Sequence, residues 1–163
     1  MNLLMNELFG SSLDAQQLVR AGVRLTFAAL IGASIGLQRQ LNGKAAGLRT
    51  HMLVALGTTM FVLTCVLAGM PEDGLTRVMQ GIATGIGFLG AGAILKVERE
   101  QEILGLTTAA DIWLTAAASV AVGIGHYATA IAVTILACLV LSVLVRVEQR
   151  INEARDRHRP RIP

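Results

Sequence analysis

The sequence contains few charged residues, few aromatic residues and only two cysteines. Charged residues occupy 15% of the 163 positions, whereas soluble domains carry about 25%. Aromatic side chains are limited to four Phe, one Trp and one Tyr. Because 53% of the residues are nonetheless hydrophobic, the apolar content consists mainly of Ala, Leu, Val and Ile, with many glycines among them. This composition argues against an ordinary soluble domain.

Neither cysteine belongs to a recognisable motif. Cys65 and Cys138 each lie within a long apolar stretch, where a free cysteine behaves as a small hydrophobic residue. The sequence has no C-x-x-C or Cys/His cluster that would indicate a metal site. It also offers no plausible Ser-His-Asp or Cys-His arrangement, and no pair of carboxylates within an apolar stretch. We therefore predict no enzymatic activity and no cofactor, and the sequence defines no metal ligands.

Long apolar stretches are instead the dominant feature. They reach or approach the roughly 18 to 20 residues that cross a bilayer as a helix. Backbone polar groups in hydrocarbon must be satisfied internally, so helices are the expected form. The links between the stretches are too short for a second domain. Five stretches are predicted to span the membrane, at residues 18–37, 50–70, 76–95, 106–125 and 127–147.

The prediction is an all-α polytopic membrane protein in three parts. These are an N-terminal segment (1–17), a five-helix transmembrane domain (18–147) and a basic cytoplasmic tail (148–163). The N-terminal segment has neither a basic region nor a small-residue cleavage site, so we expect no removable signal peptide.

Basic residues are distributed unevenly between the two sides of this predicted bundle. Eleven lie in the first and third links and the tail, against three (Arg20, Arg24 and Arg77) on the other side. The positive-inside rule then places the N-terminus outside and the C-terminus in the cytoplasm. The net charge of +3 reflects this topology and contact with anionic lipid headgroups. The tail lacks interleaved aromatic residues, so we expect no nucleic-acid partner.

The glycine-rich stretch "GIATGIGFLGAGAIL" (81–95) contains a literal G-x-G-x-x-G. A dinucleotide-binding turn would need a strand before it and a surrounding sheet, for which five membrane helices leave no room. The same glycines form small-x-x-x-small patterns, such as Gly81 and Gly85, which let helices approach closely in lipid. Close packing and a kinked or unwound helix are both open. The first and fourth stretches carry similar patterns, so we expect a homo-oligomer, although one bundle could use them all.

Asp111 is the only acidic residue inside a predicted span. It lies about 7 to 8 Å from the cytoplasmic end of its helix, and it shares one helix face with Thr108 and Thr115. These oxygens suit a cation path. The alternative is an ion pair with a basic residue at similar depth, for which the candidates are Arg39, Arg49 and Lys96.

A second polar stripe is predicted at the outer end of the third span, where Arg77, Gln80 and Thr84 share a face. Near the outer end of the first span, Arg20 and Arg24 are expected to extend their side chains to the headgroups, and this expectation is weaker for Arg24, which lies deeper. His51, at the inner end of the second span, is a candidate either for titration near neutral pH or for a structural role.

Three ordered stretches, "IGLQRQLNGKAAGLRTHMLVALGTTMF", "RVMQGIATGIGFLGAGAIL" and "GLTTAADIWLTAAASVAVGIGHY", resemble the MgtC/SapB family of bacterial inner-membrane proteins. The resemblance covers residues 24–147. It implies a multi-pass protein linked to growth at low magnesium and, in pathogens, to survival inside phagocytes. Some members are described as restraining ATP synthase, which implies a non-enzymatic regulator contacting another membrane complex. Ion transport is the alternative, because members are often named magnesium transporters.

The resemblance also marks individual positions. Arg77 and Gln80 match an R-x-x-Q that precedes the glycine stretch. Two residues depart from the family pattern: Gln38 stands where Glu is usual, and Asp111 stands where a small or hydroxyl residue is expected. If the two positions are close together, a carboxylate has been relocated. The family's soluble C-terminal domain is not recognisable, which implies a short form. The remaining marked positions are Arg39, Gly47, Arg49, Thr50, His51, Gly85, Gly87, Phe88, Gly90, Gly92, Thr107, Thr108 and Trp113.

Overall fold

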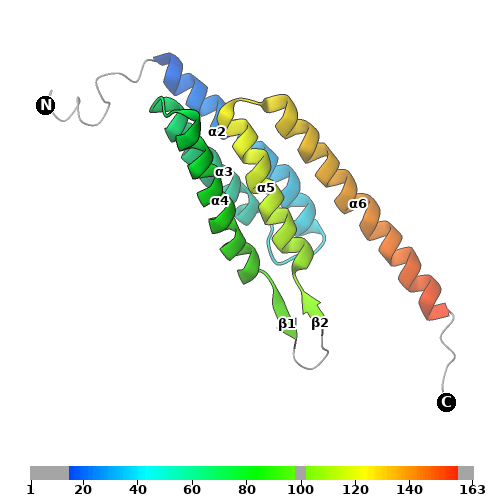
Figure 1. Cartoon of the computed structure of the whole chain (residues 1–163). Coiled ribbons are helices and arrows are strands. Elements are labelled where there is room, and N and C mark those ends of the chain that lie inside the picture. The colour runs from blue at the N-terminus through cyan, green and yellow to red at the C-terminus, as the bar shows by residue number, and fades with distance from the viewer. Residues whose placement is uncertain (1–14, 98–101, 158–163) are drawn as a thin grey trace, which may run out of the picture.

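The computed structural model describes residues 15–97 and 102–157, which form five helices and one short hairpin (Figure 1). Successive helices run in alternating directions, so the fold is the predicted all-α bundle. The hairpin between the third and fourth helices was not predicted. The elements are α2 (Ala15–Leu41), α3 (Leu48–Leu67), α4 (Glu72–Gly92), β1 (Leu95–Val97), β2 (Glu102–Leu104), α5 (Leu106–Ile124) and α6 (Tyr127–Arg157).

Helix ends differ from the predicted spans most at α2 and α6. α2 begins before residue 18 and continues past residue 37. The polar residues at its two ends still form helical backbone hydrogen bonds, although their low hydropathy placed them outside the predicted span. α6 likewise continues past the predicted boundary at residue 147 to Arg157. In Figure 1 its C-terminal part extends away from the other helices.

Within the described residues, four helices are long and apolar enough to cross a membrane by themselves: α2, α3, α5 and the first part of α6. The chain is therefore a multi-pass membrane protein. α4 does not meet that criterion, because its N-terminal half carries Glu72, Asp73, Arg77 and Gln80. It nevertheless runs beside α3 and α5 in the bundle (Figure 1). The predicted orientation, with the N-terminus outside, stays a prediction.

Close packing of α2 against α3 depends on two glycines. A Cβ atom at Gly32 would lie 2.6 Å from the carbonyl oxygen of His51, and one at Gly36 would lie 2.8 Å from the Cα atom of Leu48. The predicted small-residue face of α2 is thus used inside the bundle, and Ala28 on the same face is fully buried. On the other side of α3, a Cβ at Gly123 of α5 would lie 2.6 Å from the Cβ atom of Val62.

Two tight reversals depend on glycine for a different reason. Gly69, before α4, has φ +63°, and Gly125, between α5 and α6, has φ +92°. Residues with a Cβ rarely adopt this left-handed conformation. These turns return the chain directly to the bundle and keep neighbouring helices antiparallel.

Candidate functional site

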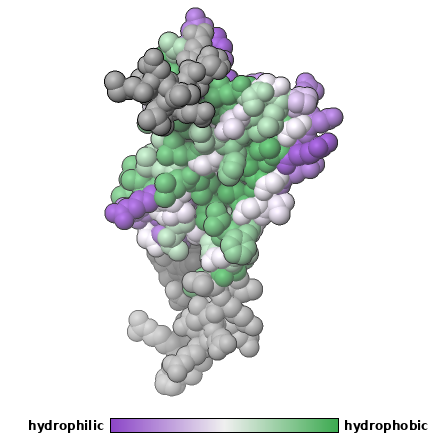
Figure 2. Space-filling model, turned by 90° about the vertical axis from the view of Figure 1, so that its left-hand side faces the viewer, coloured by the Kyte–Doolittle hydropathy of each residue, from purple (hydrophilic) through white to green (hydrophobic). Residues whose placement is uncertain are grey.

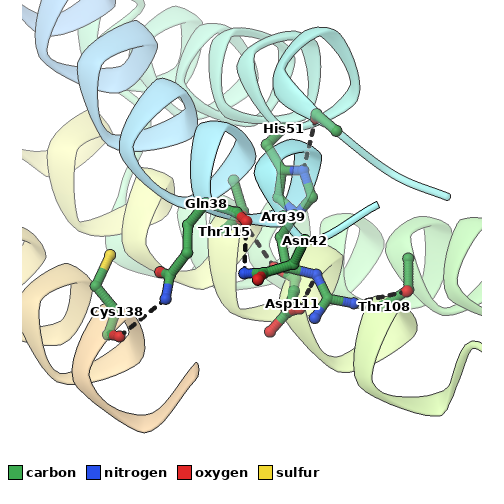
Figure 3. Close-up of polar contacts among 9 residues, drawn as sticks. Gln38, Arg39, Asn42, His51, Thr108, Asp111, Thr115 and Cys138 are labelled. Carbon is green, nitrogen blue, oxygen red and sulfur yellow. Dashed lines mark hydrogen bonds and ion pairs between the residues drawn. The ribbon is translucent and has the colours of Figure 1, made fainter. Parts of the chain in front are cut away.

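A buried ion pair joins the end of α2 to the beginning of α5 (Figure 3). Arg39 Nε and Asp111 Oδ2 are 2.8 Å apart, and the two side chains are only 3% and 7% exposed. Arg39 Nη2 also donates a hydrogen bond of 2.8 Å to Thr108 Oγ1. Thr108 and Asp111 lie three residues apart on one face of α5, so one guanidinium group contacts both.

The partner of Asp111 is thus Arg39, one of the three candidates from the sequence. Arg49 is exposed at the beginning of α3, and the side chain of Lys96 lies outside the described part of the structure. The Arg39 Nε–H is not directed at Oδ2 closely enough for a hydrogen bond, and both atoms are buried with no hydrogen-bond partner among the described residues. The contact is therefore primarily an interaction of charges, which is strong where water is excluded.

His51 lies beside this pair, fully buried in the first turn of α3 (Figure 3). Its Nδ1 is 2.9 Å from the carbonyl oxygen of Gly47. A carbonyl oxygen can only accept, so Nδ1 carries the proton and donates. In the neutral ring Nε2 is then an acceptor, and it is buried with no hydrogen-bond partner in the part of the chain that the structure describes.

Gln38 directs its side chain toward α6 instead of α5 (Figure 3). Its Nε2 donates to Ser142 Oγ at 2.6 Å and to the carbonyl oxygen of Cys138 at 3.2 Å. Adjacent residues of α2 therefore connect that helix to two different neighbours. Gln38 and Asp111 share no hydrogen bond or ion pair with each other, and a relocated carboxylate stays a hypothesis.

The polar stripe of α5 continues beyond Asp111 as a buried row of hydroxyl groups. Thr115 Oγ1 donates to the carbonyl oxygen of Asp111 at 2.8 Å, and Ser119 Oγ donates to that of Thr115 at 2.7 Å. Thr59 of α3, which the sequence analysis did not single out, donates to the carbonyl oxygen of Ser119 at 3.0 Å. The hydroxyl protons of this row are thus used within the bundle.

Neither of two grooves on the molecule reaches this row. One lies between α3 and α4, and the other lies between α4 and α5 beside Trp113. Both are lined mainly by apolar residues, and Asp111 lines neither of them. The arrangement around Asp111 is a buried polar cluster that ties α2, α3 and α5 together.

The second predicted stripe is not part of this cluster. Arg77, Gln80 and Thr84 lie on α4 and are exposed on its outward side, where Thr84 Oγ1 donates to the carbonyl oxygen of Gln80 at 2.9 Å. Arg24, by contrast, is held by the bundle: its Nη1 donates to the carbonyl oxygen of Gly123 at 2.7 Å.

The remaining motif positions are dispersed. Gly90 packs at the junction of α4 and α5, where a Cβ atom would lie 3.5 Å from that of Ala109. At Gly47, before α3, a Cβ atom would lie 3.1 Å from Gln40 Oε1. A Cβ at Gly85, Gly87 or Gly92 would meet nothing within 4 Å. The exposed motif residues in this group are these three glycines and Arg49, Thr50, Phe88, Thr107 and Trp113.

Comparison with known proteins accounts for these motifs. The model of the MgtC family matches residues 25–150. The chain belongs to the MgtC family. The match covers all five helices of this MgtC-family protein apart from their outermost ends, and it includes every residue of the cluster around Asp111. No solved structure matches the chain.

Three curated relatives show the extent of the similarity. "Putative magnesium transporter YhiD" of Escherichia coli is 42% identical over 128 residues, which are 74% of this chain and 59% of that protein. Protein SrpB of Synechococcus elongatus is 42% identical over 137 residues, covering 77% of this chain and 75% of SrpB. Protein MgtC of Salmonella typhimurium is 39% identical over 131 residues, covering 80% and 55%. The chain thus matches less than two thirds of the length of YhiD and MgtC.

Proposed function

We propose that this protein is a multi-pass protein of the bacterial inner membrane that supports adaptation to low magnesium. It acts as a non-enzymatic regulator through contact with another membrane complex, such as ATP synthase. Family membership and the magnesium-related name of YhiD support the link to magnesium. The contact with another complex rests on the resemblance of its motifs to regulatory members of the family.

The burial of Asp111 and its ion pair with Arg39 are the observations that carry this proposal. Asp111 is the only buried acidic side chain among the described residues, and Arg39 already neutralises it. A magnesium path needs carboxylate or carbonyl oxygens together with room for the waters that the ion retains. Here the neighbouring hydroxyl groups donate to helix carbonyls. The cluster is thus better suited to holding helices together than to conducting a hydrated cation.

Ion transport is the second candidate, and one specific observation favours it. The buried row from Thr108 through Asp111 and Thr115 to Ser119 follows α5 along much of its length. An ionisable residue within a membrane bundle is commonly functional. Transport would require the Arg39–Asp111 pair to open, so that the carboxylate becomes available to the ion.

Magnesium entry into proteoliposomes distinguishes the two functions. Purified full-length protein is reconstituted with a magnesium-sensitive dye inside the vesicles, beside an Asp111→Asn variant and protein-free vesicles. A regulator gives entry no faster than protein-free vesicles, with the wild-type protein shown to be folded by size-exclusion chromatography. Entry that Asp111→Asn abolishes, while that variant stays folded, contradicts the regulatory proposal and establishes transport.

Growth at low magnesium tests the same proposal in cells. In a strain that requires an MgtC-family protein for this growth, a regulator should retain complementation when Asp111 and Arg39 are replaced together by apolar residues, provided that the variant accumulates normally. A transporter that uses the carboxylate should lose complementation.

A further inference from the structure

We propose that the outward face of α4 binds α4 of a second copy of this chain, in a parallel helix pair centred on Gly81 and Gly85. This inference concerns a surface away from the cluster around Asp111, and it does not depend on the proposed function.

The first observation is that Gly81, Gly85 and Gly87 of α4 have no packing role among the described residues. A Cβ atom at Gly81, Gly85 or Gly87 would meet nothing within 4 Å. In the same bundle, a Cβ at Gly32 or Gly36 would come within 2.8 Å of the backbone of α3. The helix also stays continuous across its glycines, from Glu72 to Gly92, so they do not serve to unwind it.

The second observation is an open groove beside these glycines. It has a volume of about 660 Å³ and runs between α3 and α4. Gly81 and Gly85 lie along one side, and Leu53, Gly57 and Phe61 lie along the other. Figure 2 presents the side of the molecule on which α4 lies: hydrophobic residues form a broad band across it, with hydrophilic residues near its margins. A helix that approaches Gly81 and Gly85 could therefore pack closely against α4.

The third observation is that the same side of α4 carries polar side chains that lipid cannot satisfy. Arg77 and Gln80 are exposed, and their side chains make no hydrogen bond or ion pair to another described residue. Gln80 lies eight residues beyond Glu72, about 12 Å along the helix axis. Arg77 can extend toward the headgroups, but the Gln80 amide at that depth requires a partner. The same polar residues make α4 too polar to qualify as an independent span.

A second copy supplies complementary groups. Two copies inserted by the same route have the same orientation, so their α4 helices run parallel about a two-fold axis normal to the membrane. Gln80 then faces Gln80 of the partner copy at equal depth, and an amide can both donate to and accept from its twin. Asp73 and Arg77 lie one turn apart on the exposed side, so each arginine can approach the other copy's aspartate. The Gly81-x-x-x-Gly85 spacing permits the close approach that these contacts need.

The test compares leucine substitutions in two open places, a double substitution on α4 and a single one on α2. Gly81→Leu/Gly85→Leu fills the proposed interface, and Gly22→Leu adds bulk on α2, where nothing lies within 4 Å of an added Cβ either. Full-length proteins carrying donor or acceptor dyes are reconstituted together in phospholipid vesicles, and energy transfer is measured as the protein-to-lipid ratio is varied. The Gly81→Leu/Gly85→Leu variant should require about a tenfold or greater increase in that ratio to reach half-maximal transfer. Gly22→Leu should behave as the wild type does.

Cross-linking provides a readout that does not depend on bulky substitutions. In a chain with Cys65→Ala and Cys138→Ser, Gly81→Cys places a thiol at the proposed interface. Leu136→Cys places a matched thiol on α6, nine residues from the beginning of its helix as Gly81 is from the beginning of α4. Leu136 is 61% exposed. Oxidation in vesicles should yield disulfide-linked dimers for Gly81→Cys and few for Leu136→Cys.

Three results would overturn the proposal. The wild type could stay monomeric at every protein density, which would leave the α4 face to lipid or to a different protein. The Gly81→Leu/Gly85→Leu variant could associate as strongly as the wild type. Cross-linking could also be efficient at Leu136→Cys and absent at Gly81→Cys, which would place any dimer interface on α6.

Discussion

Replacing Asp111 with Asn tests whether the Arg39–Asp111 pair holds the bundle together. The change preserves the size of the side chain and removes its negative charge. Arg39, whose side chain is only 3% exposed, is then left as a buried cation with the hydroxyl group of Thr108 as its hydrogen-bond acceptor. Removing one partner of a buried pair costs about 3–5 kcal/mol. We expect a loss near the lower end, about 3 kcal/mol, because the Thr108 contact persists.

The free energy of unfolding, measured by denaturant titration in mixed micelles, gives the result. Glu72→Gln, at an exposed position in the first turn of α4, is the matched control and should change the free energy by no more than about 0.5 kcal/mol. Equal effects of the two substitutions would refute a stabilising role for the pair.

A double-mutant cycle makes the test specific to the pair itself. Arg39→Met alone leaves a buried carboxylate and should cost about as much as the loss of Asp111. Arg39→Met/Asp111→Leu replaces both charges with apolar groups, which is often close to neutral. The double variant should therefore be at least about 2 kcal/mol more stable than the sum of the single effects predicts. If the single costs simply add, the two residues do not act as a pair.

Two further substitutions test packing and hydrogen bonding elsewhere in the bundle. Gly32→Ala should lower the free energy of unfolding by about 1–3 kcal/mol, because its Cβ would lie 2.6 Å from the carbonyl oxygen of His51. Gly22→Ala, in open space, should be neutral or stabilise by up to about 1 kcal/mol, and equal thermal stabilities for the two would contradict this packing. Gln38→Leu removes the donor to Ser142 Oγ and should cost about 0.5–1.5 kcal/mol. The double variant Gln38→Leu/Ser142→Ala should lose less free energy of unfolding than the sum of the two single variants, as measured by the same titration. Additive losses would argue against a direct hydrogen bond.

The helices could be predicted from the sequence because bilayer thickness fixes the length of an apolar helix. The ends of the helices could not be predicted from hydropathy. Polar residues such as Gln38 and Arg39 continue α2, because they form the same backbone hydrogen bonds as apolar residues do. The hairpin of β1 and β2 was also missed. It consists of two three-residue strands, too short for an alternating pattern to stand out.

For the cluster around Asp111, the sequence could predict only which residues lie at a similar depth in the membrane. Arg39 and Arg49 are both expected near Asp111 by depth, yet only the Arg39 side chain points into the bundle. That direction follows from how α2 is rotated against α3 and α5, and the rotation depends on contacts such as Gly32 against α3. A single sequence specifies which residues share a helix face but does not specify what that face contacts.

The glycine patterns illustrate the same limit. Gly32 and Gly36 have the same spacing as Gly81 and Gly85, and either pair could have formed the packed interface. In the structure the first pair closes α2 onto α3, while the second borders an open groove. Small residues four apart thus permit close approach without specifying whether the approaching helix belongs to the same chain.

The two proposals constrain each other at the surface of α4. A second copy bound at Gly81 and Gly85 would occupy the groove between α3 and α4, so another membrane complex would have to bind a different face or compete with the dimer. In the low-magnesium growth assay, Gly81→Leu/Gly85→Leu separates these cases. If the regulated complex binds elsewhere, the variant should lose association in vesicles and retain complementation. If the complex and the second copy use the same face, the added bulk should abolish both, whereas Gly22→Leu should preserve both. Loss of complementation with unchanged self-association would refute the α4 pair and assign this face to the other complex.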